Sequence, residues 1–371
     1  MTFSPAAGAA IPGSDPIPVI LVAFVAAALI ALLLTPAISR FVRRRGILDH
    51  PSPRRVNRRP LPRGGGVAVM IAFVLVGGTL ALAGTAIPGA PDPHSVRPQL
   101  LGVFGGAVLA ALIGAVDDRF DLRARWQFLG QIVLALVAVV SGITVAVITN
   151  PFGSEPFVFG GALAAAFTVV WIVGMINSIN FIDGLDGLSS GIALIAAVTL
   201  GILSLSGGQP FVAVLCFVFA GGLLGFLRWN FHPATIFQGS AGVMFLGYTL
   251  AALSILGTAK VIVALLVLGV PIIDSFWVIV RRLSRGRSPF SPDRGHIHHR
   301  LLDLGLSHRA TVLLIYGICA TLGVVSLLVS AATGVYAFLG ALVMFGILVF
   351  VLAREEHEAL ESTSYEDEGG S

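Results

Sequence analysis

The chain has 371 residues, of which 56% are hydrophobic and only 11% are charged. Soluble domains usually carry about 25% charged residues, so a water-soluble fold is excluded and the membrane is the expected environment. The formal net charge of +4 comes from arginines spread over many segments rather than gathered on one soluble module, which argues against a nucleic-acid partner. Cys216 and Cys319 both lie in apolar stretches, so neither a disulfide framework nor a cysteine metal cluster is expected.

Apolar stretches of spanning length follow one another along the chain and predict an all-α, polytopic membrane protein with about eleven transmembrane helices. They run approximately over 17–39, 66–87, 99–116, 126–148, 160–176, 187–206, 209–227, 241–258, 260–280, 310–331 and 333–352. Abundant Gly and Ala in these stretches allow helices to approach closely in lipid. The pattern predicts one integral-membrane domain over residues 1–353, followed by an acidic, disordered tail over 354–371.

The basic residues indicate which loops face the cytoplasm. With the predicted spans taken in order, all but Arg97 and Lys260 of the 23 basic residues fall on one side of the membrane. By the positive-inside rule that side is cytoplasmic. The sequence therefore predicts a multi-pass protein of the inner (plasma) membrane with its amino terminus outside and its carboxyl terminus in the cytoplasm. The same arginines suit anionic lipids or phosphorylated substrates.

The first polar cluster follows the third predicted span and contains Asp117, Asp118 and Asp121. If the helix continues through this stretch, Asp117 and Asp121 share a face at the i, i+4 spacing. Three carboxylates so close repel one another unless a cation or an arginine lies among them. A solvated loop end balanced by arginines is the alternative interpretation, and we favour a cation-binding site.

The second cluster joins the fifth and sixth predicted spans and places two amides and two carboxylates at intervals of three residues: Asn177, Asn180, Asp183 and Asp186. Polar groups at membrane depth are costly and generally face a protein interior or a wet cavity. Helix capping accounts for one such residue but not for four at this spacing. Gly184 and Gly187 allow the backbone to leave the helix and approach a ligand. We interpret the cluster as part of a binding site.

The third cluster lies in the longest inner loop and contains His296, His298, His299 and Arg300, after Ser291-Pro-Asp-Arg-Gly295. A zinc site is one interpretation, but no cysteine accompanies these histidines. Histidine beside arginine suits the oxygens of a phosphate or diphosphate better. Two glycine-containing segments, Pro60–Gly66 and Phe237–Gly242, either present backbone amides to an anion or permit tight helix packing.

Together these clusters resemble the polyprenyl-phosphate N-acetylhexosamine-1-phosphate transferases, within glycosyltransferase family 4. The Asp-Asp-x-x-Asp pattern of that family falls on residues 117–121, its Asn-x-x-Asn-x-x-Asp-Gly-x-Asp-Gly pattern on 177–187, and its late histidine motif on 296–299. The resemblance covers about residues 54–309, and the motifs occur in the family's order. Aspartate at position 121 is typical of the branch that uses a simple UDP-N-acetylhexosamine, such as the undecaprenyl-phosphate GlcNAc-1-phosphate transferases.

The resemblance implies ten or eleven transmembrane helices around a cytoplasmic active-site cleft, and a Mg²⁺-dependent transfer of N-acetylhexosamine-1-phosphate from a UDP-sugar to a polyprenyl phosphate, with release of UMP. Such a reaction is the first membrane step of a cell-envelope glycan pathway. The implied catalytic residues are Asp117, Asp118 and Asp183, and the implied metal ligands are Asp183, Asp186 and Ser240. The implied substrate-binding residues are Arg63, Asp121, Asn177, Asn180, His296, His298, His299 and Arg300. A homodimer through membrane helices is compatible with this pattern.

The chain departs from the family pattern at two places. The family's Phe-Met-Gly-Asp-x-Gly-Ser motif here reads Phe237-Gln-Gly-Ser240-Ala-Gly-Val, so a neutral hydroxyl stands where the family has a metal-binding carboxylate. Asn57 stands where the family tends to have histidine, and it cannot exchange a proton at neutral pH. These departures keep two alternatives open: a catalytically degenerate homologue that binds lipid phosphate or a partner, and a transporter. The transporter is disfavoured because its ionisable residues should lie near the bilayer midplane, where Asp274 is the visible exception.

Overall fold

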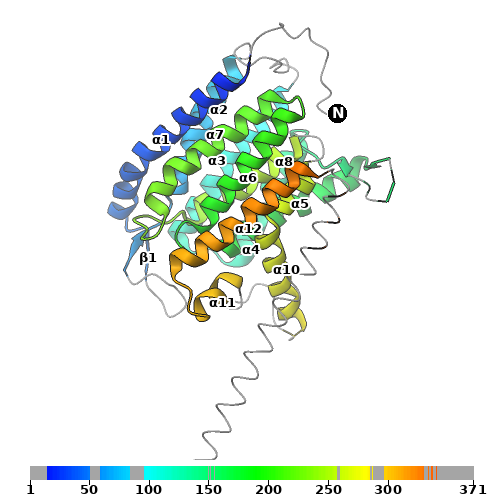
Figure 1. The fold of residues 1–371 in the computed structure, drawn as a ribbon. Coiled ribbons are helices and arrows are strands. Elements are labelled where there is room, and N and C mark those ends of the chain that lie inside the picture. The colour runs from blue at the N-terminus through cyan, green and yellow to red at the C-terminus, as the bar shows by residue number, and fades with distance from the viewer. Residues whose placement is uncertain are drawn as a thin grey trace, which may run out of the picture.

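The structure is a computed structural model that describes residues 15–50, 59–83, 96–148, 155–256, 260–284 and 296–329, with a few single residues outside these ranges (Figure 1). Several features named above lie outside the described residues: Asn57, the segment 291–295, most of the last predicted span at 333–352, and the tail from 354 to 371.

The described chain is almost entirely helical. In chain order the helices are α1 (Ile17–Arg44), α2 (Gly66–Ala83), α3 (Arg97–Phe120), α4 (Ala124–Val140), α5 (Gly161–Ile182), α6 (Leu188–Ser206), α7 (Pro210–Asn230), α8 (Gly239–Leu256), α9 (Lys260–Val267), α10 (Gly269–Ser284), α11 (Ile297–Asp303) and α12 (His308–Leu328). Two short antiparallel pairs join β1 (Leu48–Asp49) to β2 (Leu61–Pro62), and β3 (Val147–Ile148) to β4 (Phe157–Val158).

The helices confirm a polytopic membrane protein. Among the described residues, eight helices are long and apolar enough to cross a membrane, namely α1, α2, α3, α5, α6, α7, α8 and α12. The apolar helix α4 is shorter than predicted, because it ends at Val140 and Gly142 then takes the left-handed backbone that glycine permits. The stretch predicted as one span over 260–280 is two helices that meet at Leu268. Pro271 lacks the N–H that would bond one turn back and its ring crowds that turn, which accounts for the break.

Helix α8 lies at the centre of the bundle, and small residues let its neighbours approach it. A Cβ atom added to Gly66 of α2 would lie 2.1 Å from the Cα atom of Gly242, and one added to Gly114 of α3 would lie 2.2 Å from the carbonyl oxygen of Ser240. On the side facing α5, a Cβ at Gly247 would lie 2.5 Å from the Cα of Ile176. Backbone contact of this kind is how membrane helices pack tightly. It brings α2, α3 and α5 together around the start of α8.

The loops predicted to lie on one side of the membrane do meet at one end of the bundle, the lower end in Figure 1, where β1 and α11 lie. Arg63, before α2, contacts Asp118 at the end of α3, and Asp118 in turn contacts the start of α8. Gly184, between α5 and α6, lies against His298 of α11. Residues separated by more than a hundred positions in the sequence therefore share one polar region.

Candidate functional site

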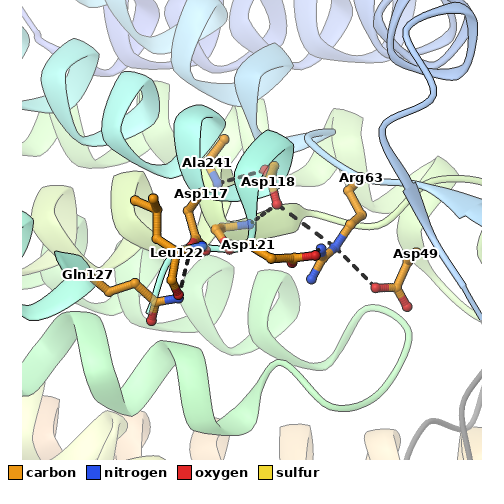
Figure 2. Close-up of polar contacts among 9 residues, drawn as sticks. Asp49, Arg63, Asp117, Asp118, Asp121, Leu122, Gln127 and Ala241 are labelled. Atoms are coloured by element: carbon orange, nitrogen blue, oxygen red, sulfur yellow. Dashed lines mark hydrogen bonds and ion pairs between the residues drawn. The ribbon is translucent and has the colours of Figure 1, made fainter. Parts of the chain in front are cut away.

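Asp118 joins α3 to the start of α8. Its Oδ1 accepts a hydrogen bond from the amide of Ser240 at 2.8 Å, and its Oδ2 accepts one from the amide of Ala241 at 3.0 Å (Figure 2). A helix N-terminus has unpaired amides and a positive dipole end, so a carboxylate is a favourable acceptor there. Asp118 is thus buried, at 8% exposure, and both of its oxygens are engaged by the protein.

Arg63 lies among three carboxylates. Its Nε is 3.1 Å from Oδ1 of Asp49 and 4.0 Å from Oδ1 of Asp118, and its terminal nitrogen is 3.2 Å from Oδ1 of Asp121 (Figure 2). Asp49 and Arg63 are brought together by the β1–β2 pair, which ends beside them. Among the residues that the structure describes, one guanidinium faces three carboxylates with Asp117 nearby, an arrangement that would attract a cation.

Asp117 is held from one side by α4 and its preceding turn. Its Oδ1 accepts hydrogen bonds from the amide of Leu122 and from Nε2 of Gln127, each at 2.9 Å. Helix α3 ends at Phe120, and Asp121 takes a left-handed backbone with φ +46°. The prediction that the helix continues and places Asp117 and Asp121 on one face is therefore wrong. The turn places Asp121 near Arg63, where its side chain is 88% exposed.

A cavity of about 220 Å³ lies beside these residues. Its lining includes Arg63, Asp117, Asp121, Asn180 and Ser240, all of which the sequence singled out. The remaining lining residues are Leu122, Gln127, Gln131, Ile176, Val243 and Met244. Arginine, carboxylate, amide and hydroxyl groups from five segments of the chain thus face one space.

Asn177 and Asn180 differ in position although they lie one turn apart on α5. Asn177 donates from Nδ2 to Oε1 of Gln131 on α4 at 2.7 Å and to the carbonyl of Val173 at 2.8 Å. Asn180 lines the cavity. Asn177 therefore ties α5 to α4, whereas Asn180 is placed to contact a ligand.

Asp183 follows α5 directly and accepts a hydrogen bond at Oδ1 from the hydroxyl of Ser189. Burial raises the pKa of Asp183 to about 7, assisted by the charges of Asp118 and Asp186 and opposed by the Ser189 hydrogen bond and by Arg63. These interactions place Asp183 in the same electrostatic environment as Asp118 and Arg63. A carboxyl with such a pKa can hold or release a proton near neutral pH.

Asp186, three residues later, has different partners. Its Oδ2 is 2.8 Å from Nδ1 of His232 and accepts a hydrogen bond from the amide of Ala234 at 3.0 Å. The ring of His232 stacks on His308 with centroids 4.1 Å apart. Potential ligand atoms of Asp186, His232 and His308 all lie within 4.8 Å of one another. The predicted pair Asp183 and Asp186 is thus divided between two neighbouring groups of side chains.

The inner histidine loop is anchored to α10 by Asp274. Oδ2 of Asp274 is 2.7 Å from Nδ1 of His296, and Oδ1 accepts a hydrogen bond from the amide of Ile297 at 2.9 Å. Asp274 is 2% exposed, and His296 also stacks against Phe181 at the end of α5. Asp274 therefore fixes the start of α11 beside the carboxyl end of α5.

His298 packs directly against Gly184, which lies between Asp183 and Asp186. A Cβ atom added to Gly184 would lie 2.2 Å from Nε2 of His298. His298 is 1% exposed, and burial together with the neighbouring histidines holds its pKa well below 6.5. His299, whose ring centroid is 4.3 Å from that of His298, and Arg300 are half-buried on the same helix. His298 therefore supports the Asp183–Asp186 loop as a neutral ring.

The two glycine-containing segments use their amides differently. The amides of Gly65 and Gly66 donate to the carbonyls of Phe237 and Gln238 at 2.9 and 3.0 Å, and those of Ser240 and Ala241 donate to Asp118. The first segment therefore uses its amides in close packing, whereas the second presents two amides to an anion that the protein itself supplies, the Asp118 carboxylate.

The side chains fit a hard divalent cation through oxygen rather than nitrogen. Mg²⁺ prefers carboxylate, carbonyl and water oxygens, and such donors face the cavity from Asp117, Asp121 and Asn180, with the Ser240 hydroxyl beside them. The group formed by Asp186, His232 and His308 offers two imidazoles and suits a softer metal such as zinc. The oxygen donors of the cavity are therefore the better match to the implied magnesium.

Several side chains of the site are absent from the sequence prediction. Gln127 and Gln131 are spaced i, i+4 on a largely apolar helix, and that spacing alone could have identified them as one polar face. His232 follows the seventh span on the predicted cytoplasmic side, and the position of its neighbour Arg228 could have drawn attention to it. Asp49 gives no comparable sequence pattern, because its role depends on pairing across β1 and β2.

This fold and site define a class: a polytopic membrane protein whose loops at one end of the bundle form a polar, carboxylate-rich cavity. Residues 100–258 match Glycosyl transferase family 4. The chain is 36% identical over 338 residues to a probable undecaprenyl-phosphate N-acetylglucosaminyl 1-phosphate transferase of Bacillus subtilis, covering 90% of each chain. It is 34% identical over 354 residues to the decaprenyl-phosphate N-acetylglucosaminephosphotransferase of Mycobacterium tuberculosis, covering 88% of this chain and 87% of the other.

A third relative, the undecaprenyl-phosphate alpha-N-acetylglucosaminyl 1-phosphate transferase of Thermotoga maritima, is 32% identical over 273 residues, which cover 73% of this chain and 78% of that one. At this identity and coverage the chain belongs to glycosyltransferase family 4, as the three motifs predicted.

Proposed function

We propose that the protein transfers N-acetylglucosamine-1-phosphate from UDP-N-acetylglucosamine to a polyprenyl phosphate and releases UMP. The observation that carries this proposal is that residues of the first two family motifs and of the segment before α8 meet at one cavity, which Arg63, Asp117, Asp121, Asn180 and Ser240 line together. The three relatives described above are named for this type of transfer.

In this proposal the adjacent carboxylates of Asp117 and Asp118 have different roles. Asp118 is engaged through both oxygens by the start of α8, so it serves to position α3 against α8. Asp117 lines the cavity, and its two hydrogen bonds within the protein both end on Oδ1. Oδ2 of Asp117 is therefore the oxygen proposed to contact the lipid phosphate, orienting it toward the β-phosphorus of the UDP-sugar and holding a proton if one is released.

The positive groups act on the leaving nucleotide. Arg63 is held in place by Asp49 and lines the cavity, where it can pair with a phosphate oxygen in the forked geometry that guanidinium favours. Asn180 of α5 also lines the cavity and adds an amide group that can donate a hydrogen bond to the nucleotide. When bound to Asp117, Asp121 and Asn180, Mg²⁺ would neutralise charge on the diphosphate. At about 220 Å³ the cavity is below the roughly 300–1,000 Å³ of typical ligand pockets, which suits the diphosphate rather than the whole UDP-sugar.

The membrane arrangement follows from the alternation of the helices. Between β2 and α12, the chain returns to the end of the bundle that carries the site after α3, α5, α7 and α10. Helix α4 therefore counts as one crossing of the membrane, and the α9–α10 pair counts as another. With the predicted last span at 333–352 we infer eleven crossings, the site in the cytoplasm and the amino terminus outside.

Cysteine labelling tests this orientation. Cys216 and Cys319 are both buried, so the native chain should give little background. Arg123→Cys, exposed at the site end, should react with a membrane-impermeant maleimide only in inverted vesicles, whereas Phe152→Cys, 84% exposed near the β3–β4 pair, should react only from the outside. Reaction of both variants from the same side, or the reverse pattern, would contradict the inferred topology.

The transfer assay tests the function. Purified protein in detergent with Mg²⁺ should convert labelled UDP-N-acetylglucosamine and a polyprenyl phosphate into a labelled lipid diphosphate, with one UMP released per product. Mixtures without the lipid phosphate are the control, because simple hydrolysis would release UMP there as well. A folded protein that forms no lipid product would contradict the proposal.

The serine in place of a carboxylate favours one second candidate, a homologue that binds its ligands without turnover. Ser240 lines the cavity with a neutral hydroxyl. Ser240→Asp distinguishes the two. If the wild type is inactive and this variant transfers, the chain is the degenerate homologue; if the wild type transfers, the variant should lower the Mg²⁺ concentration needed for half-maximal rate.

A further inference from the structure

Gln238 is a buried amide in the turn that leads into α8, at the place where the family pattern has methionine. The residue is 1% exposed, and its carbonyl accepts the amide of Gly66 at 3.0 Å. Its side chain is confined by glycines, since a Cβ atom added to Gly242 would lie 2.2 Å from its Cγ. A long polar side chain is thus held in one position inside the protein, where it needs a hydrogen-bond partner.

That partner is Ser189, which also contacts Asp183. The Ser189 hydroxyl lies 3.2 Å from the Gln238 side-chain oxygen and donates to Oδ1 of Asp183. A hydroxyl has one proton, so it cannot donate to both acceptors. The other end of the same amide, Nε2 of Gln238, is buried without a partner in the described part of the chain.

Rotation of the terminal amide by 180° removes this conflict. The oxygen and nitrogen of a glutamine side chain are assigned from the hydrogen-bond network and not from their shape. With Nε2 toward Ser189, the amide donates to the serine oxygen, and the serine donates to Oδ1 of Asp183 when that carboxyl is deprotonated. The three side chains then form one directed chain of hydrogen bonds, and the buried donor is satisfied. Such chains strengthen cooperatively inside a protein.

We propose that Gln238 is a positioning residue for the transfer reaction, acting through Ser189 to hold Asp183 in one orientation. The proposal rests on the proposed function. Asp183 follows α5 directly and precedes Gly184, so its backbone lies where the helix gives way to a glycine-containing turn. Because Oδ1 is held by Ser189, we take Oδ2 as the oxygen of Asp183 that is available to a ligand. Because Ser240 supplies no carboxylate, the orientation of Asp183 matters more in this chain than in a member with aspartate at that position.

A mutant cycle on Gln238 and Ser189 tests the chain of hydrogen bonds. Gln238→Met keeps the length but removes the donor, and Ser189→Ala removes the link. Each single variant should lower kcat roughly five- to thirtyfold while KM for UDP-N-acetylglucosamine stays unchanged, since the contact orients a group rather than binding the substrate. The double variant should be no slower than Ser189→Ala alone. Thr249→Val, a buried substitution on α8, is the matched control and should change kcat by less than about twofold.

The possible outcomes distinguish a failure of the positioning role of Gln238 from a failure of the proposed transfer reaction. Wild-type protein without transfer overturns the proposed function, and the role of Gln238 in it. Active wild type with unaltered Gln238→Met, or with losses that multiply in the double variant, overturns the positioning role alone. If Gln238→Met does not fold, as judged by its melting temperature, Gln238→Glu keeps the shape while losing the nitrogen donor. It should be at least as slow as Ser189→Ala, and wild-type activity in it would contradict the proposal.

Discussion

Two neighbouring regions at the same end of the bundle both contain aspartates paired with basic side chains, but they differ in how those side chains are packed. The carboxylate cluster comprises Arg63 with Asp49, Asp117, Asp118 and Asp121; it borders a cavity, and among the described residues it places four carboxylates around one guanidinium. The histidine cluster comprises His232, His296, His298 and His308, and its rings are stacked on one another or paired with aspartates. The first region presents oxygens to a cavity, whereas the second packs ring against ring and supports the Asp183–Asp186 loop. Substitutions should therefore abolish chemistry in the first and disturb geometry or stability in the second.

The largest effect is expected for Asp117→Asn. The asparagine keeps the shape and an acceptor for Leu122 and Gln127, but it loses the charge that faces the cavity. We expect kcat to fall by about 10²–10⁴ with little change in melting temperature. Asp303→Asn, which alters an exposed carboxylate of α11 outside the cavity, is the control and should be close to wild type. A loss of less than about tenfold in Asp117→Asn would remove the distinction between the two regions.

An intermediate effect is expected for Gly184→Ala. The added methyl group would lie 2.2 Å from Nε2 of His298 and must displace either the ring or the Asp183–Asp186 loop. A shift of this size in a loop that carries a site residue should lower kcat/KM about ten- to a hundredfold. Gly174→Ala on α5, where the methyl group meets no atom within 4 Å, is the matched control. Equal activity in the two alanine variants would mean that the histidine cluster does not position the loop.

The smallest effect concerns pH and stability. Burial holds the pKa of His298 well below 6.5, so below pH 6.5 the unfolded chain binds a proton that the folded chain does not. Its contribution to folding is complete above about pH 6.5 and falls as the pH drops, by at most about 1.4 kcal/mol per pH unit. The melting temperature of His298→Asn should therefore fall less between pH 7 and pH 5 than that of the wild type. His50→Asn, at an exposed histidine, should follow the wild type, and an unchanged pH dependence in His298→Asn would show that the ring is protonated in the fold.

Much of the fold was predictable because the membrane restricts the alternatives. Apolar length identified the helices, and the arginine distribution identified which loops lie together, as the contact of Arg63 with Asp118 confirms. What the sequence did not reveal depends on local backbone chemistry. The break at Leu268 and the end of α4 at Val140 leave the hydrophobic pattern uninterrupted, because proline and glycine act on the main chain rather than on polarity.

The site was predictable at the level of motifs and not at the level of partners. Their spacing predicted that Asp183 and Asp186 act as a pair. In the structure, however, Asp183 contacts Ser189 and Asp186 contacts His232. Which oxygen meets which donor depends on how helices far apart in sequence pack, and a single sequence does not report that packing. The same holds for Asp118, whose two acceptors are used by amides more than a hundred residues away.

The link between Asp118 and the start of α8 has a consequence for how members of this family are recognised. Because the carboxylate satisfies two amides that would otherwise be buried without partners, its loss would destabilise the fold whether or not the chain has activity. Natural selection would then retain aspartate at this position even in a lineage that had ceased to turn over substrate. Within the first motif, Asp118 is thus a marker of ancestry, whereas Asp117, which lines the cavity, is the better marker of activity.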